Sequence, residues 1–297
     1  MKAVKRVKKL TKKRKLRKRL RPSRRQKGGG NKVVVFTLTN NAGFGSVFGF
    51  LLMTYIYAQT KHYDFRIKNE NWLYSPNKGW HEFFTTLKDY NPSEKYDSEE
   101  NYRHATNGTS SSFTLEQYNK AIQEVYVPTN EILTKANEFI DTIGGPYVSF
   151  FIRRGDKVSG ASKEMDAINI KDIVSLSGVK EGNVFVMSDE YSAVKEIIDL
   201  LPNCKIHTLT PSSSSGFSVQ HVQKNGGVPR NEAIELFTSI EVFHRGEKGW
   251  ADNRSNIGRL LKMRDLDKVI LYPASDKTQH IPLSTVVSPS TRELSSS

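Results

Sequence analysis

The chain has 297 residues, which is enough for two domains with cores of ordinary size, and its hydrophobic content of 37% excludes a wholly disordered protein. The formal net charge is +14, but 16 of the 45 Lys and Arg residues lie within residues 1–27, which contain no Asp or Glu. The rest of the chain holds 29 basic and 31 acidic residues, so the pI of about 9.6 describes the tail and not the body.

Residues 1–30 form a basic N-terminal segment that ends in three glycines. Like charges at this density repel one another, so we expect a disordered arm joined to the body by a glycine hinge. Such an arm would bind polyanions non-specifically, either nucleic acid or an anionic membrane, or it would act as a nuclear address. No aromatic residue interrupts residues 1–27, which argues against sequence-specific base stacking.

The first folded segment reads as a βαβ unit. Residues 32–38 are a continuous run of mostly β-branched residues, typical of a buried parallel strand. A glycine-bearing turn follows, then an apolar helix to about Gln59 and a second strand at residues 63–67. The most apolar stretch, residues 47–58, is too short for the roughly 20 residues that span a membrane, so we expect a buried helix and no transmembrane segment.

The middle of the chain is polar and then helical. Residues 85–112 are rich in Asn, Ser, Asp and Glu, and we expect a long surface loop there. Residues 114–143 have helical spacing that is broken near Pro128, and we expect two domains to meet in this region.

A second alternating series begins at residue 147. It predicts four strands and three helices, the strands at residues 147–152, 184–187, 205–209 and 269–272 and the helices at residues 192–201, 231–243 and 256–263. The expected organisation is therefore α/β, with Rossmann-like domains at residues 31–143 and 144–283 facing a central cleft and a Ser-rich flexible tail at residues 284–297.

The single cysteine, Cys204, cannot form an internal disulfide, and no apolar stretch follows the basic N-terminus as it would in a signal peptide. Both observations favour a cytoplasmic location. The seven histidines show no metal-ligand spacing, so no metal site is expected.

The charged string RRGDKV at residues 153–158 directly follows a predicted buried strand. Ligands of open α/β sheets bind at the carboxyl ends of strands, and an arginine placed there can hold a phosphate bidentately. A solvated charge cluster is the alternative interpretation. Asp189 follows another strand in the same way, and it would either line the same site or form an ordinary turn.

Three motifs, whose order along the chain also agrees, resemble the fucosyltransferase superfamily. The resemblance is greatest to the alpha-1,6-fucosyltransferases and extends to the protein O-fucosyltransferases. RRGDKV at residues 153–158 is similar to the phosphate-binding signature of that family. NWLY at residues 71–74, followed by GW at residues 79–80, is similar to its N-terminal segment, which the turn NAGFG at residues 41–45 also fits. SNIGR at residues 255–259 is similar to its late Ser-x-x-x-Arg motif. The resemblance covers roughly residues 31–275.

The resemblance implies a GT-B glycosyltransferase fold, GDP-fucose as the donor substrate, inversion at the anomeric carbon, no cofactor and no required metal. It implies that Arg153 grips the donor diphosphate and that Arg154 supports the loop or the leaving group. Asp156 and Lys157 match motif residues around the site.

The late motif and one helical position complete the implied donor site. Ser255 matches a phosphate-binding serine, and it also stands where it could cap a helix beginning at Asn256, whose N-terminus would favour an anion. Arg259 matches the arginine of the same motif. Glu235 stands where the family tends to have a base-reading Asp, with an exposed helix residue as the alternative interpretation. Phe151 replaces a family histidine that helps to hold the nucleotide, which leaves another nucleotide-sugar donor open.

Inverting transfer needs a carboxylate that takes the proton of the attacking hydroxyl. The family places a Glu shortly after the arginine motif, and a three-residue insertion at residues 159–161 would align Glu164 with it. An ordinary loop glutamate is the alternative interpretation of Glu164, and Asp166 is the substitute candidate.

In the N-terminal domain, which would hold the acceptor, Asn41, Gly43 and Gly45 would form the loop that faces the donor. Trp72 and Trp80 would either stack against an acceptor sugar or pack in the core. A glycan or glycoprotein is the expected acceptor, and a non-catalytic binding protein that its basic tail tethers to nucleic acid is the rival class.

Overall fold

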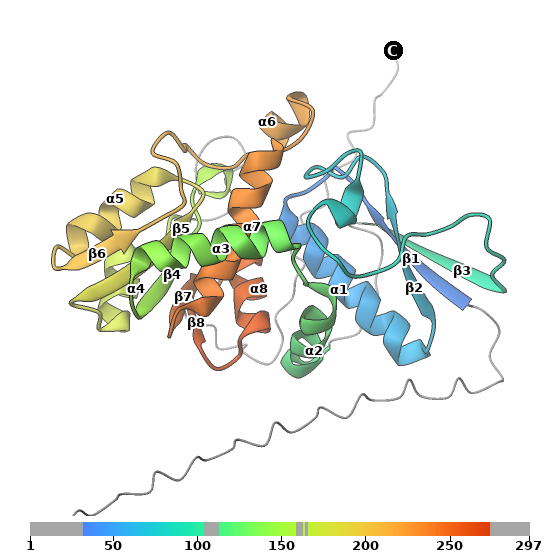
Figure 1. Cartoon of the computed structure of the whole chain (residues 1–297), viewed down its shortest axis with the longest axis horizontal. Coiled ribbons are helices and arrows are strands. Elements are labelled where there is room, and N and C mark those ends of the chain that lie inside the picture. The colour runs from blue at the N-terminus through green and yellow to red at the C-terminus, as the bar shows by residue number, and fades with distance from the viewer. Residues whose placement is uncertain (1–31, 104–112, 159–162, 164–165, 274–297) are drawn as a thin grey trace, which may run out of the picture.

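The computed structural model describes residues 32–103, 113–158, 163 and 166–273. These residues form two parallel sheets that lie side by side, each flanked by helices (Figure 1). This is the two-sheet α/β architecture that the sequence predicts. The expectations for residues 1–30 and 284–297 lie outside the described residues.

The first sheet has the strand order β2-β1-β3, and both pairings are parallel. Its central strand β1 (Lys32–Leu38) is buried from Val33 onward, which explains its nearly unbroken apolar sequence. Helix α1 (Phe44–Lys61) connects β1 to β2 (Asp64–Asn69) and buries most of its length. A short 3-10 helix, η1 (Gly79–Glu82), follows β2.

The expectation of an uninterrupted loop over residues 85–112 is wrong. Strand β3 (Ser98–Arg103) lies within it and pairs with β1 in parallel register. Its sequence, SEENYR, lacks an apolar run because β3 is an edge strand. The strand is recognised by its backbone pairing with β1 and not by buried side chains. Hydropathy therefore gave no signal for it.

Two helices connect the sheets, α2 (Leu115–Val125) and α3 (Asn130–Ile143). Thr114 begins α2 with a capping box, in which its side chain and that of Gln117 bond each other's backbone N–H groups. Pro128 lies between the helices, as the sequence predicts. Helix α2 packs against α1 and α8, whereas α3 packs against α7 of the second half.

The second sheet has the strand order β6-β5-β4-β7-β8, and every pairing is parallel. Its elements in chain order are β4 (Tyr147–Ile152), η2 (Gly155–Lys157), α4 (Ile170–Ser177), β5 (Gly182–Ser188), α5 (Tyr191–Leu200), β6 (Cys204–His207), α6 (Val219–Lys224), α7 (Arg230–Arg245), β7 (Gly249–Asp252), α8 (Asn256–Arg264) and β8 (Val269–Tyr272). The four-residue strand β7 was not among the predicted strands.

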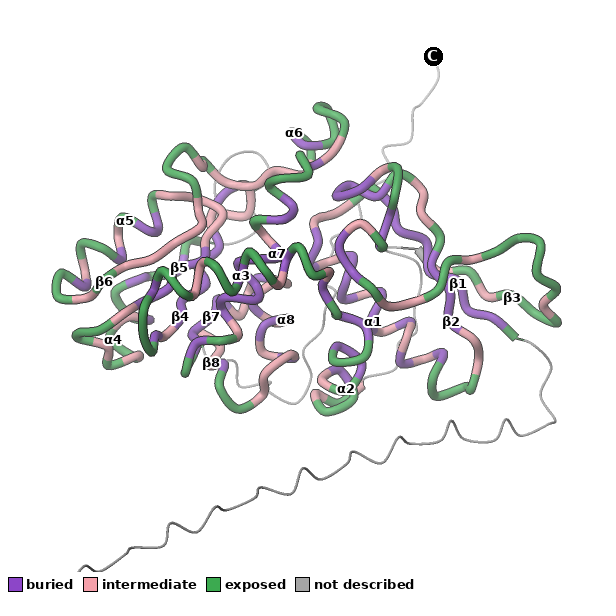
Figure 2. The backbone as a smooth tube through the Cα atoms, viewed as in Figure 1, coloured by how far each residue is buried: buried purple, intermediate pink, exposed green. Residues whose placement is uncertain are grey.

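A continuous apolar core joins the two halves of the molecule. One cluster of buried residues runs from β1 and α1 through η1 and α2 to α7 and α8, and a second cluster fills the opposite face of the second sheet. Neighbouring residues of β4 divide between them, since Phe151 belongs to the first cluster and Phe150 to the second. Buried segments accordingly run through the middle of the molecule, between the sheets (Figure 2).

Within the described part of the chain, no helix combines the length and the apolar character that crossing a membrane requires.

Candidate active site

The carboxyl ends of three neighbouring strands bring charged residues together at one edge of the second sheet. Asp189 follows β5, Arg153 follows β4, and Asp252 is the last residue of β7. These strands are adjacent in the sheet, so side chains that are distant in sequence meet there. The position is the one at which open α/β sheets bind ligands.

Arg153 is the centre of this cluster and is only 9% exposed. Its guanidinium forms ion pairs with Asp189 and, at 2.6 Å, with Asp156, and it also donates to the Phe217 carbonyl at 3.5 Å. Burial lowers the pKa of the Arg153 guanidinium, and the Asp156 carboxylate opposes that shift. An arginine has five N–H donors, so these contacts fix the group in place without exhausting it.

Asp189 organises the loops around Arg153. One carboxylate oxygen accepts the backbone N–H of Arg154 at 2.8 Å, and the other accepts that of Phe217 at 3.1 Å in addition to the Arg153 ion pair. Gly155 makes this packing possible: its φ is +63°, and an added Cβ would stand 2.5 Å from the Asp189 carboxylate. Of the two interpretations that the sequence left open for Asp189, this contact favours a place in the same cluster as Arg153.

Phe217 links the cluster to the first half of the molecule. Its ring stacks on Tyr74 with 6.5 Å between the centroids, and it lies 3.3 Å from where a Cβ on Gly43 would stand. The Tyr74 hydroxyl accepts the backbone N–H of Phe44 at 3.0 Å, and burial raises the pKa of Tyr74 to about 12. The loop after β1 and the loop before α6 therefore meet at Phe217, whose carbonyl accepts from Arg153. Sequence reasoning missed Phe217 because only this tertiary contact marks it.

The end of β7 adds a second charge network. Asp252 is fully buried, and Arg254 pairs with both of its carboxylate oxygens at 3.0 Å. Arg259, from the first turns of α8, donates to the Asn253 carbonyl at 2.7 Å, and burial lowers its pKa while Asp252 opposes that shift. Neither Asp252 nor Arg254 was predicted from the sequence, because recognising them required recognising β7.

Helix α8 begins after Ser255, as predicted, but the Ser255 side chain makes no capping hydrogen bond. The first turn of α8 instead meets the start of α1. An added Cβ on Gly45 would stand 2.8 Å from the backbone nitrogen of Ile257, so glycine is required for this contact. The predicted residues Gly45 and Ser255, from opposite ends of the chain, therefore lie at one junction.

Other predicted residues of the arginine motif lie near the cluster with different contacts. The Arg154 side chain turns away to the Ile168 carbonyl and to Glu196, both at 3.1 Å, and so supports the following loop. Lys157 lies in η2 beside Asp156 and is partly exposed.

Glu235 belongs to the second half of the molecule. It is exposed on α7, where desolvation and Glu232 raise its pKa while Lys135 of α3 opposes that shift. None of its described contacts reaches the Arg153 cluster.

The two candidate bases differ in what the structure describes. Glu164 lies outside the described residues. Asp166 is exposed and pairs with Lys163 at 2.7 Å, which lowers its pKa and makes its carboxylate a weaker proton acceptor. The Asp166 carbonyl accepts from Arg254 at 2.5 Å, which ties this loop to the end of β7.

Of the two interpretations of Trp72 and Trp80, packing in the core is correct and stacking against an acceptor sugar is excluded. Both are fully buried, at 0% and 1% exposure, and they pack with Phe83 and Phe84 in the common core. Their rings are thus unavailable to a ligand. Asn41, by contrast, is exposed and lines a pocket at the carboxyl ends of β1 and β2.

Comparison with known proteins identifies the fold. No family model and no curated protein matches the sequence. Among solved structures, NodZ alpha-1,6-fucosyltransferase soaked with GDP-fucose matches with a TM-score of 0.50 and 12% identity, covering 79% of this chain and 92% of that one. An Arabidopsis thaliana FUT1 variant in complex with GDP matches with a TM-score of 0.53 and 8% identity, covering 86% and 72%. The chain therefore has a GT-B-like fold similar to that of these fucosyltransferase structures, which is the fold that its motifs predict.

Proposed function

We propose that the chain is an inverting glycosyltransferase of the fucosyltransferase type, which transfers a sugar from a nucleotide-diphosphate donor, GDP-fucose, to a glycan hydroxyl. The observation that carries the proposal is the position of Arg153. It lies at the carboxyl edge of the second parallel sheet, held by Asp156 and Asp189, in a fold shared with structures solved with GDP or GDP-fucose.

In this proposal the donor diphosphate lies against Arg153. Negative charge grows on the departing nucleoside diphosphate in the transition state, and cations that are already fixed in place stabilise it without reorganising. Arg259 adds a second, half-buried cation that interacts with Asp252, as Arg153 does, and Ser255 brings a hydroxyl to the start of α8. Because the protein supplies these groups itself, no metal ion is needed.

The acceptor hydroxyl must lose a proton as it attacks, and Glu164 is the proposed base. Arg154 and Arg254 hold the carbonyls of Ile168 and Asp166, which follow Glu164 in the sequence. The lowered pKa of Asp166 makes it the weaker candidate.

The identity of the donor nucleotide sugar depends on the residue at position 151. Phe151, where the family has a histidine, is 2% exposed and packs in the common core, so its side chain offers the nucleotide no polar group. This favours keeping other nucleotide-sugar donors as a second candidate.

The proposal is tested by radiolabel transfer from a panel of nucleotide sugars, with the wild-type chain and the Glu164→Gln and Asp166→Asn variants. We expect transfer from GDP-fucose, and a rate lowered by about 10²–10⁴ in Glu164→Gln alone, the usual contribution of a general base. Transfer from a different donor would replace GDP-fucose, and loss of activity in Asp166→Asn alone would move the base. No transfer from any donor would contradict the proposal.

A further inference from the structure

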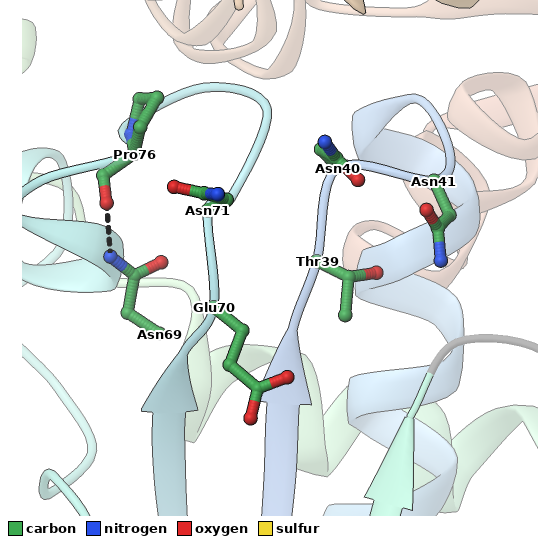
Figure 3. A pocket seen from close by; sticks show the side chains of 7 residues that line it. All are labelled: Thr39, Asn40, Asn41, Asn69, Glu70, Asn71 and Pro76. Atoms are coloured by element: carbon green, nitrogen blue, oxygen red, sulfur yellow. Dashed lines mark hydrogen bonds between the residues drawn. The ribbon is translucent and has the colours of Figure 1, made fainter.

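A polar pocket of about 530 Å³ opens at the carboxyl ends of β1 and β2, in the first half of the molecule. Figure 3 shows two groups of side chains around it, one from the turn after β1 and one from the loop after β2. Its lining is almost entirely polar and consists mainly of amides, from Thr39, Asn40, Asn41, Asn69, Glu70 and Asn71. None of the described residues that line the pocket is aromatic, and Trp72, which follows Asn71, is fully buried.

The backbone of the loop after β2 is fixed before any ligand arrives. The Asn69 side chain donates to the Pro76 carbonyl at 2.8 Å and accepts the backbone N–H of Trp72 at 3.1 Å, so it spans the loop. The backbone N–H of Glu70 donates to the Leu38 carbonyl at 2.8 Å, which joins the loop to β1. A rigid backbone of this kind holds the lining side chains in place.

Several lining groups have hydrogen-bonding capacity that the protein does not use. Among the described residues, the side-chain amides of Asn40, Asn41 and Asn71 have no protein partner, and the Thr39 hydroxyl is buried without one. Asn71 has a φ of +58°, a left-handed conformation that asparagine tolerates better than most residues. Each amide can donate and accept at once, which matches a hydroxyl on the ligand.

We infer that this pocket binds the hydroxyl groups of a neutral sugar, which is the acceptor; the acceptor role rests on the proposed function. Charge favours a neutral ligand, because the Glu70 carboxylate is paired with Lys68 at 2.8 Å and the remaining lining side chains are uncharged. An anionic sugar would meet Glu70 and no unpaired lining cation.

The turn after β1 connects the pocket to the Arg153 edge. Asn41 is two residues from Gly43, which contacts Phe217, and the Phe217 carbonyl accepts from Arg153. The Gln223 side chain also donates to the Asn40 carbonyl at 2.6 Å, so α6 of the second half borders the pocket as well. A sugar bound there would lie beside the proposed donor site.

The test uses saturation-transfer NMR on the full chain with chitotriose, cellotriose and maltotriose, and with trigalacturonate as the anionic control. Asn71→Gly removes the amide and keeps the left-handed backbone, and Glu70→Gln removes only the charge. Gln59→Ala, an exposed amide change on α1, is the matched control. We expect at least one neutral trisaccharide to bind, and the two pocket variants to weaken it by about tenfold, the upper range for one lost hydrogen bond. Gln59→Ala should bind like the wild type.

Acceptor kinetics and GDP affinity separate this inference from the proposed function. We expect the pocket variants to raise the acceptor KM by a similar factor and to leave the GDP Kd unchanged. If the trisaccharide binds and both pocket variants weaken it while the chain transfers no sugar, the binding site stands and the proposed function fails. No binding of any neutral trisaccharide, equal binding by the pocket variants, or a loss of GDP affinity in them would overturn the inference.

Discussion

At the scale of single residues, the position of the arginine in the site is fixed by its ion pairs with two carboxylates. Arg153 is buried between Asp156 and Asp189, and removing a partner from such a group leaves an uncompensated charge, which costs about 3–5 kcal/mol. An alanine at position 153 would therefore mix a loss of stability with a loss of donor contact. Lysine is the informative replacement, because it keeps the charge and removes the planar fork.

His244 gives a residue-scale prediction that does not depend on function. Both of its ring nitrogens are buried without a hydrogen-bond partner among the described residues, and burial, followed by Arg264 and Lys268, lowers its pKa well below the ordinary value. The unfolded chain binds a proton at this position below about pH 6.5 and the folded chain does not. Stability is therefore complete above that pH and is lost as the pH falls.

We expect the free energy of unfolding, measured by denaturant titration, to fall from about pH 7.5 to about pH 5.5. His244→Phe should fall by about 1 kcal/mol less than the wild type over this interval. Identical pH slopes in the two proteins would show that His244 is accessible to protons in the folded state.

At the scale of elements, α1 and α8 form a close contact between the two halves. Gly45 lies so near the backbone of Ile257 that a methyl group has no room, and overpacking of this kind costs about 1–3 kcal/mol. We expect Gly45→Ala to lower the melting temperature and to weaken GDP binding, because Ser255 directly precedes α8 and Arg259 lies on it. Gly145→Ala is the control, since its Cβ would meet Asn183 at an ordinary 3.5 Å. A Gly45→Ala protein as stable as the control would contradict the contact.

Helices and strands were predicted well from the sequence where their residues are buried and therefore apolar. They were predicted poorly where a strand is formed by backbone hydrogen bonds without an apolar run. The runs that became β1 and α1 are apolar because both are buried, and their positions were predicted to within about two residues. Strand β3 is an acidic edge strand, and β7 has only four residues, so neither carries a hydropathy signal.

The same limits explain the site. Arg153 and Asp189 were both candidates because each follows a recognisable strand, and Asp252 was missed because β7 was. Phe217 reaches Arg153 only through the packing of two loops. Trp72 was open to two interpretations because an aromatic motif in the sequence does not say which side of the loop its rings occupy, and burial decides for the core.

At the scale of the whole molecule, the shared core joins two sheets that could otherwise have been independent domains. Since one apolar cluster runs from β1 to α8, we expect a single cooperative unfolding transition in calorimetry. Two separated transitions would show that the halves unfold independently.

A chain beginning at Asn31 should show the same transition, because the charges of residues 1–27 are segregated from the body. It should also lose the salt-dependent binding of polyanions. A loss of folding in this shortened chain would show that the tail is structural.

The central claim is that Arg153 binds the diphosphate of a donor nucleotide without a metal. Isothermal calorimetry of GDP in the presence of EDTA tests it most directly, with the wild type, Arg153→Lys and, as control, Arg245→Lys, an exposed arginine on α7. The wild type and the control should bind GDP equally, and Arg153→Lys should bind at least about tenfold more weakly, since hydrogen bonds to charged groups contribute about 1.5–3 kcal/mol. No GDP binding in EDTA, or equal binding by Arg153→Lys, would contradict the claim.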